Sequence, residues 1–306
     1  MNRAVANWLQ APSILVLFLW MAIPLSMTLY FSFQRYILTK PQISGFAGWR
    51  NYTNFASNEF WSSIGNTLTI VIGILLFTLV LGLLIAMLIN RAFPGRGIVR
   101  VLLISPFFIM PAVNALMWKN LMLNPTNGLI AYLHDRVEGL GCWLTQGGGL
   151  FNWIGQFSCG SDPINLFDAN YGVYGIILIV AWQWTPFAIL IFMTSLQSED
   201  QEQKEAAVLD GASPWSQFWN LTLPHLARPI AIVMMIQLIF HLSLYAEIFY
   251  TGASAGAENL AFAIDKAGLG GGLNFGKAAA GGVFAILLAN IAAIVLIRIV
   301  GRNLTD

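Results

Sequence analysis

Long apolar runs dominate this chain, and shorter polar connections separate them. Six runs reach about 20 residues, the length that an α-helix needs to cross the hydrocarbon core of a membrane. They are residues 11–33, 65–90, 99–121, 172–195, 229–252 and 277–300. The two longest connections are 122–171 and 196–228. The pattern predicts an all-α integral membrane protein in which residues 1–306 form one transmembrane domain of six helices.

The composition agrees with a bilayer as the surroundings. Hydrophobic residues make up 57% of the 306 residues and charged residues only 9%. A soluble domain of this length would have to hide nearly all of that apolar surface, so membrane lipid is the simpler partner. The formal net charge of +1 provides no strong field, and we expect no nucleic-acid partner.

The basic residues favour one orientation. The short connection 91–100 holds three arginines, which places it inside by the positive-inside rule. Both termini and the connection 196–228 then lie in the cytoplasm as well. Against this, Arg35, Lys40 and Arg50 would lie outside, so the total bias is nearly even. We give more weight to the short connection, because basic residues count most in short loops.

Prolines interrupt the third run. Pro106 and Pro111 lie in the stretch SPFFIMPAVNALMW. A proline removes a backbone donor and clashes with the preceding turn of a helix. We therefore expect the third span to bend or break there.

The outside connection 122–171 contains both cysteines of the chain, Cys142 and Cys159. In an oxidising compartment a disulfide between them would stabilise this connection. The alternative is two unpaired thiols packed against neighbouring side chains. No set of histidine, cysteine and acidic residues with ligand spacing occurs here, so we expect a docking surface or a cover and not a catalytic site. No metal site is expected on the chain.

The connection 196–228 concentrates acid, since five of the 14 carboxylates fall between Glu199 and Asp210. Ser198 and Gln201 have the spacing of a capping box at the start of a helix. Gly211 occupies the position after that helix where a left-handed backbone is common. The acidic residues lie toward the helix start, where the helix dipole favours them.

A second helix is predicted directly after this turn. Ser213 and Pro214 provide a cap and a proline at the first helical position. Trp215, Phe218 and Trp219 follow at spacings that form one apolar stripe. Pro224 is expected to end this helix before the fifth span. A helix–turn–helix at a membrane surface could be an amphipathic linker, but its carboxylates would be repelled by anionic headgroups, so a protein partner is favoured.

Polar side chains inside the runs are candidates for a transport path. Gln237, His241 and Tyr245 recur at i+4 and therefore share one side of the expected fifth span. Aromatic faces next to amides and hydroxyls suit a polyhydroxylated ligand. Such residues also commonly join helices to each other. The candidates for substrate contact are Asn114, Gln183, Trp184, Gln237, His241, Tyr245 and Asn290.

Other chemistry is poorly supported. Gly271 to Lys277 completes a phosphate-loop spacing, but Ala278 replaces the residue that should hold magnesium, and no strand precedes it. We interpret it as a glycine-rich entrance to the sixth span. No nucleophile, base and orienting partner can be assembled, so the chain is not expected to be an enzyme. A stand-alone secondary transporter would need charges near mid-membrane, where only Lys119 and Glu247 come close.

One motif carries a family resemblance. Glu205-Ala206-Ala207, Gly211, Leu221 and Leu223-Pro224 have the spacing of the EAA loop of bacterial ABC-importer permeases, E-A-A-x3-G-x9-I-x-L-P. The chain departs from that pattern only at Leu221, where the family has isoleucine.

The resemblance implies that this loop is a coupling helix that docks on an ATPase. Glu205 would be a polar anchor, Gly211 the turn, and Ala206 and Ala207 would allow close approach. It further implies two ATPase subunits that hold ATP and magnesium, a second permease in a heterodimer, and an extracytoplasmic binding protein. No cofactor is expected on this chain, and the location implied is the bacterial cytoplasmic (inner) membrane.

Most of the chain resembles carbohydrate-importer permeases of the maltose-permease type. Stretches such as AWQWTPFAILI and IPLSMTLYFSF are most similar to sorbitol/mannitol permeases. The segment Cys142–Asp168 looks like an insertion relative to them. The resemblance implies import of a polyol or sugar, with a disaccharide or glycoside as the alternative cargo.

Overall fold

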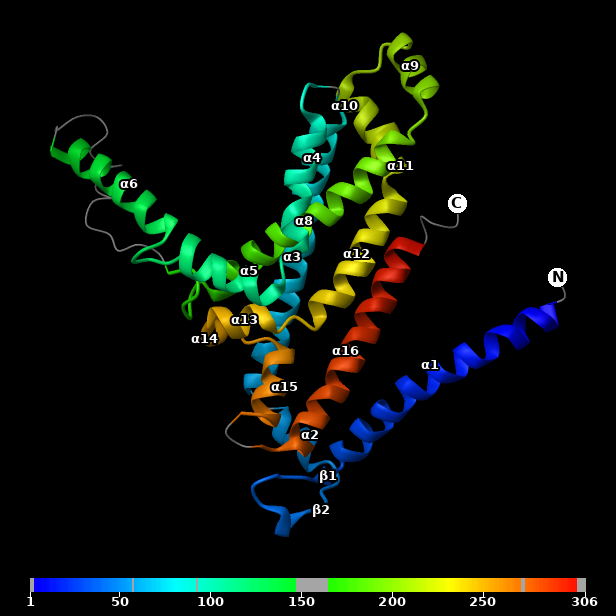
Figure 1. Ribbon diagram of the computed structural model, residues 1–306, viewed down its shortest axis with the longest axis vertical. Helices are drawn as coiled ribbons and strands as arrows, with labels where there is room; N and C mark the ends of the chain where they lie inside the picture. Colours follow the sequence, from blue (N-terminus) through cyan, green and yellow to red (C-terminus); the bar gives the residue numbers. More distant parts are fainter. Residues whose placement is uncertain (1–2, 57, 92, 147–164, 271–272, 302–306) are drawn as a thin grey trace. The chain divides into compact units, whose positions relative to one another are not determined.

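The computed structural model describes residues 3–56, 58–91, 93–146, 165–270 and 273–301. The described chain is helical apart from a two-stranded antiparallel ribbon of β1 (Gln34–Arg35) and β2 (Gly45–Phe46). The helices, drawn in Figure 1, are α1 (Arg3–Ser32), α2 (Arg50–Phe55), α3 (Asn58–Asn90), α4 (Arg96–Ile104), α5 (Pro111–Met117), α6 (Leu129–Gln146), α8 (Gly172–Gln197), α9 (Gln201–Leu209), α10 (Pro214–Gln217), α11 (Leu223–His225), α12 (Ala227–Leu242), α13 (Ala246–Thr251), α14 (Ser254–Ala257), α15 (Leu260–Gly268) and α16 (Phe275–Gly301).

Among the described residues, four helices are long and apolar enough to cross a membrane: α1, α3, α8 and α16. Two bent pairs pass the same test together, which raises the number of candidate spans to six if each pair is one span. The first pair joins Arg96–Phe108 to Pro111–Met122, and the second joins Pro214–His225 to Ala227–Leu242.

The third predicted span breaks where the prolines predict a break. The two halves of the first pair differ in direction by 102°. Met110 has an extended backbone (φ −61°, ψ 140°), as expected for a residue that precedes a proline, and Pro111 begins α5. The expected interruption is confirmed.

The helix in the fifth apolar run ends before the run itself does. The predicted span is 229–252, but α12 ends at Leu242 and α13 begins at Ala246. Tyr245 lies between them with φ −139°, outside either helix. Tyr245 therefore does not share a helix face with Gln237 and His241, and that expectation is wrong.

The chain divides into two compact units. The first comprises Met1–Ile64 and Leu260–Ile291. Its core is an aromatic cluster in which the Phe60 ring lies 4.8 Å from the Phe284 ring and 5.3 Å from the Phe55 ring. Burial of such rings dominates the energetics of a small core. The ribbon extends this unit, with Gln34 paired to Phe46 and Arg35 to Gly45.

A buried amide joins α1, the ribbon and α2 within this first unit. Asn51 Nδ2 donates to the Ser32 carbonyl oxygen at 2.9 Å and to the Gln34 carbonyl oxygen at 2.7 Å. Only 5% of the Asn51 surface is exposed. The amide thus satisfies two carbonyls at the point where α1 ends, a position that otherwise leaves acceptors without donors.

Replacing Asn51 with alanine is expected to lower the thermal unfolding midpoint of the detergent-solubilised chain. The buried Ser32 carbonyl and the partly buried Gln34 carbonyl lose their donor, and a buried acceptor left unpaired costs about 1–3 kcal/mol in unfolding free energy. Thr53→Ala is the matched control, because Thr53 lies on the same helix, is exposed and bonds only the nearby Arg50 carbonyl in the described contacts. Equal midpoints for the two variants would contradict the joining role of Asn51.

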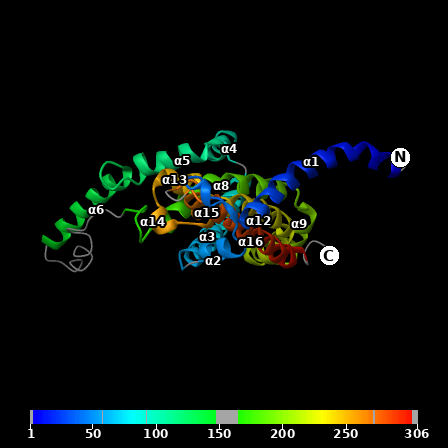
Figure 2. The same cartoon turned by 90° about the horizontal axis from the view of Figure 1, so that it is seen from below.

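The second unit comprises Gly65–Asn259 and Ala292–Asp306, and α8 is its central helix. In α8, 14 of 26 residues are buried. Gly82 of α3 permits close approach, since a Cβ there would lie 2.7 Å from the Ala188 Cβ of α8. Phe192 of α8 and Val233 of α12 are fully buried in the same cluster. Helix α13 packs beside α5, and the two lie next to each other in both views (Figures 1 and 2).

Candidate functional site

The acidic helix of the connection 196–228 is α9, and its cap differs from the predicted one. Asp200 is the N-cap residue, and its Oδ1 accepts a hydrogen bond from the Glu202 backbone N–H at 2.9 Å. Ser198 does not cap the helix, because its hydroxyl donates to the Ser195 carbonyl at the end of α8. A carboxylate at the N-cap accepts the free N–H and also neutralises the positive end of the helix dipole.

The turn after α9 has the predicted chemistry. Gly211 has φ 78°, in the left-handed region, and its N–H donates to the Val208 carbonyl at 3.0 Å. A Cβ on Gly211 would meet no atom within 4 Å, so the backbone conformation and not lack of space calls for glycine. Ser213 Oγ accepts from the Ser216 N–H at 3.2 Å, and Pro214 begins α10. The predicted cap and first-turn proline are confirmed.

The second helix of this segment runs past Pro224. Helix α10 continues through a π-helical turn, Phe218–Thr222, into α11, which ends at His225. A π-helical turn changes the register of backbone hydrogen bonds, so a proline just beyond it removes no regular bond. The helix ends at His225, one residue after Pro224, and the chain bends by 57° before α12. The predicted end before the fifth span is therefore displaced by one residue. We call Asp200–His225 the helix–turn–helix segment.

The tip of this segment exposes apolar side chains beside acid. Leu209 is 87% exposed and Trp215 is 69% exposed. The Trp215 ring lies 6.0 Å from the Phe218 ring and 5.7 Å from the Trp219 ring, so the predicted aromatic stripe is present. The motif residues divide by exposure: Glu205, Ala206, Gly211 and Pro224 are exposed, and Ala207, Leu221 and Leu223 are half-buried. An exposed apolar tip of this kind can dock on another protein.

A groove opens elsewhere in the second unit, where α8, α12 and α13 meet. It has a volume of about 290 Å³. The Trp184 ring lies 4.9 Å from the His241 ring and 5.1 Å from the Phe240 ring. The lining residues are Pro111, Trp184, Phe240, His241, Ser243, Leu244, Tyr245, Ala246 and Glu247. Aromatic faces therefore form one wall, and hydroxyl and carboxyl groups are available on the remainder.

Two of the path candidates join helices. Asn114 Nδ2 donates to Gln183 Oε1 at 2.9 Å and to the Ile179 carbonyl at 3.2 Å. Gln183 Nε2 donates to the Ile109 carbonyl, at the break between α4 and α5. These amides hold α5 and the break against α8, which is the helix-joining alternative for polar residues in membrane helices.

Gln237 also joins two helices, and some of the buried polar candidates have atoms left over for a ligand. Gln237 Oε1 accepts from Thr78 Oγ1 of α3 at 2.7 Å. Among the described residues, the buried atoms Gln237 Nε2, His241 Nε2 and Asn114 Oδ1 have no hydrogen-bond partner. Buried polar atoms are usually paired, so these atoms have capacity for a ligand or water.

The remaining candidates fall into two groups, those that line the groove and Asn290. Trp184, His241 and Tyr245 line the groove together, although Tyr245 comes from the break after α12. Asn290 belongs to the first unit, is exposed, and donates to the Ile286 carbonyl of its own helix at 2.8 Å. Asn290 therefore lies in a different compact unit from the groove residues.

The groove is also lined by residues that were not among the candidates from the sequence. Phe240 and Ser243 lie in the groove together with Glu247, which the sequence singles out only as one of two charges that come close to mid-membrane. Spacing by i−1 and i+2 from His241 could have suggested the first two once the helix was known to end at Leu242.

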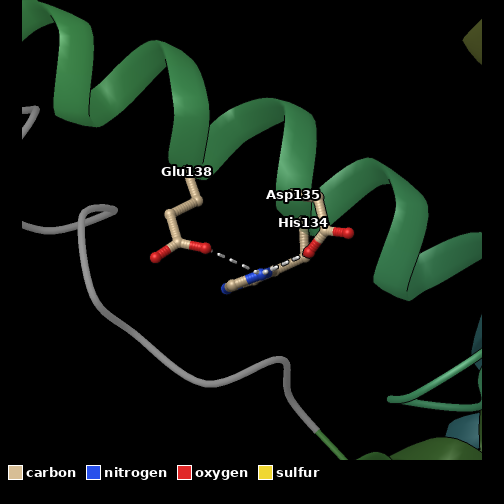
Figure 3. A group of neighbouring side chains, drawn as sticks. All are labelled: His134, Asp135 and Glu138. Carbon is tan, nitrogen blue, oxygen red and sulfur yellow. Dashed lines mark ion pairs between the residues drawn. The ribbon is translucent and has the colours of Figure 1, made fainter.

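Helix α6 lies in the connection 122–171 and carries a small charged cluster (Figure 3). His134 Nδ1 lies 3.9 Å from Asp135 Oδ1 and 4.0 Å from Glu138 Oε2. Side chains at i and i+4 meet on a helix surface, and such pairs contribute little to stability. The proposed Cys142–Cys159 pairing lies outside the described residues, because Cys159 and the side chain of Cys142 are not described.

The sequence and the fold match one family of proteins. Residues 67–306 match the family described as "Binding-protein-dependent transport system inner membrane component". The chain is 31% identical over 244 residues to a probable ABC transporter permease protein, y4oQ, of Sinorhizobium fredii, covering 79% of this chain and 72% of that protein. It is 30% identical over 227 residues to the trehalose/maltose transport system permease protein MalF of Thermococcus litoralis, covering 74% and 68% respectively.

A solved structure has the same fold. It is a chain of a bacterial ABC transporter involved in the import of the acidic polysaccharide alginate, with a TM-score of 0.72. The match covers 97% of this chain and 96% of that chain at 22% sequence identity. The predicted fold class, an all-helical membrane protein, is confirmed.

Proposed function

This chain belongs to the family of binding-protein-dependent transport system inner membrane components, and from that premise we propose that the cargo it carries is a neutral carbohydrate. The chain is the permease subunit of an ABC importer and a multi-pass inner-membrane protein, not an enzyme. ATP is hydrolysed by a separate ATPase, and a periplasmic binding protein delivers the cargo. Within the carbohydrates, we propose a polyol or sugar similar to sorbitol or mannitol.

The observation that carries the cargo proposal is the wall of the groove. Trp184 and Phe240 present aromatic faces around His241, whose Nε2 is buried without a partner among the described residues. Sugar rings and polyols offer CH faces that stack on aromatic rings and hydroxyls that bond to imidazole, amide and carboxyl groups. One similar permease is named for trehalose and maltose, which are neutral sugars.

We further propose that the helix–turn–helix segment couples this chain to the ATPase. Its support is the exposed tip, which pairs acidic Glu205 with apolar Leu209 and Trp215. Docking on an ATPase places this segment on the cytoplasmic side of the membrane, and both termini then lie in the cytoplasm as well. A second permease in a heterodimer would complete the path, and closure of two ATPases would move α9 and thereby the bent spans in an alternating-access cycle.

The cargo is identified by measuring which compounds bind the partner binding protein. Calorimetry with sorbitol, mannitol, trehalose and maltose is expected to show micromolar binding of at least one. Glycerol phosphate is the charged control and is expected to show none. Binding of the phosphorylated control with no binding of any neutral compound would contradict a neutral-carbohydrate cargo.

Reconstitution distinguishes this importer from a secondary transporter. Vesicles that contain this chain, its partner permease, the ATPases and the binding protein are expected to take up the cargo only with MgATP. Vesicles that contain this chain alone are expected to take up nothing under a proton or sodium gradient. Gradient-driven uptake by the chain alone would overturn the proposed mechanism.

A further inference from the structure

Glu199 is a buried carboxylate outside the EAA motif. It lies in the short connection between α8 and α9, and only 8% of its surface is exposed. Burial of a carboxylate is unfavourable unless it is paired and hydrogen-bonded. A charge in this position therefore indicates a specific set of partners.

Both oxygens of Glu199 have partners, and the partners come from both helices of the helix–turn–helix segment. Oε1 accepts from Thr222 Oγ1 at 2.8 Å, in the π-helical turn before α11. Oε2 pairs with Lys204 Nζ of α9 at 2.8 Å. We call Glu199, Lys204 and Thr222 the Glu199 clamp. A second contact lies nearby, where His225 Nε2 is 3.0 Å from the Ser195 carbonyl of α8.

Packing around these residues is incomplete on one side. A polar cavity of about 170 Å³ adjoins the clamp, lined by Ser198, Glu199, Asp200, Gln203, Lys204, Leu221 and His225. The covalent link between α9 and α10 is a short turn that contains Gly211 in the left-handed region. The segment would bend easily without the charged contacts.

We propose that the Glu199 clamp holds α9 and the second helix as one rigid lever, so that movement imposed on α9 reaches α12. This inference rests on the proposed coupling role of the segment. In this role Glu199 is a positioning residue: it fixes the geometry through which Glu205 acts. Loss of the clamp should let α9 move while α11 and α12 remain in place.

The experiment uses hydrogen–deuterium exchange on the assembled transporter in lipid nanodiscs, with and without MgATP and vanadate. In the unmodified chain, residues 201–209 and 218–225 are both expected to change their exchange when the nucleotide is added. In Glu199→Gln the change at 201–209 should persist. The change at 218–225 should fall on the order of tenfold, as expected for loss of one buried charge-assisted bond.

Three further variants sharpen the result. Thr222→Val removes only one hydrogen bond and serves if Glu199→Gln assembles poorly. It is expected to keep the exchange change at 201–209 and to lose most of the change at 218–225. The double variant Glu199→Lys with Lys204→Glu restores the ion pair with reversed sign. The Thr222 hydroxyl can then accept from the ammonium instead of donating, so the response at 218–225 is expected to return. Glu202→Gln is the matched control, because it removes an exposed charge from the same helix and should behave as the unmodified chain.

The outcomes separate the clamp from the coupling role. If Glu199→Gln and Thr222→Val keep the full response at 218–225, the clamp is overturned. A second outcome is that exchange rises equally with and without MgATP and vanadate, while the nucleotide-induced difference at 218–225 is preserved. That result would indicate a purely structural role for Glu199 and would also overturn the clamp. Glu205→Ala is run in parallel: if it too leaves every response unchanged, the proposed coupling role itself fails.

Discussion

Replacing Glu205 with alanine is expected to abolish uptake and binding-protein-stimulated ATP hydrolysis while the chain remains in the membrane. Glu205 is exposed on α9, one turn before the apolar tip at Leu209, so it is not part of the core and is free for the proposed docking. Removal of one charged partner from a hydrogen-bonded interface pair costs about 2–5 kcal/mol. A loss of that size lowers the affinity of the interface by at least about thirtyfold.

The matched control is Glu202→Ala, an exposed acid on the same helix. Uptake and ATP hydrolysis are measured in vesicles with all subunits, and membrane content is measured by quantitative blotting. Normal uptake by Glu205→Ala would exclude the proposed anchoring role of this side chain.

The turn offers a second substitution with the same expected loss. Gly211→Pro is incompatible with φ 78°, because proline locks φ near −65°, and it also removes the N–H that donates to the Val208 carbonyl. Gly211→Asn is the control, since asparagine tolerates the left-handed region. We expect Gly211→Asn to retain most uptake and Gly211→Pro to lose it. Similar activity of the two variants would mean that the left-handed turn is not needed for coupling.

Replacing Trp184 with alanine is expected to lower uptake by on the order of tenfold to a hundredfold. The Trp184 ring touches Phe240 and His241 and forms the aromatic wall of the groove, so alanine removes the stacking face for the cargo. Uptake is measured in the complete importer, together with binding-protein-stimulated ATP hydrolysis. Hydrolysis is expected to persist, because the helix–turn–helix segment is untouched.

The neighbouring tryptophan of α8 provides the control. Trp182 packs against Trp118 at 5.4 Å and does not line the groove. Trp182→Ala should therefore retain uptake, and Trp184→Phe should retain more than Trp184→Ala because a ring remains. Equal uptake by Trp184→Ala and the unmodified chain would remove the groove from the proposed cargo path.

Local signals predicted the helix–turn–helix well because its geometry is decided within a few residues. Gly211, Ser213 and Pro214 each act on the backbone beside them, and the structure has them where the turn rules require. The cap of α9 shows the limit of such rules. Ser198 and Asp200 are both acceptable caps, and the choice fell to Asp200 because Ser198 is occupied by the end of α8.

The groove illustrates what spacing alone misses. A continuous helix over 229–252 would place Tyr245 one turn after His241, but the helix ends at Leu242 without a proline or glycine in residues 243–245. The Leu244 carbonyl is satisfied by Asn259 Nδ2, fifteen residues further along the chain. A carbonyl freed from the helix needs such a partner when it is buried, and the partner lies too far away in sequence to be seen as a pattern.

By itself, the sequence determined the helical membrane class, the break at Pro106 and Pro111, and the turn at Gly211. Each depends on apolar length or on the backbone preference of one residue, which are local properties. Only the tertiary structure decided that Glu199 bridges Lys204 and Thr222, and that α12 stops before Tyr245. Those features depend on buried polar groups finding partners across helices, and their free energy exists only once the helices have packed.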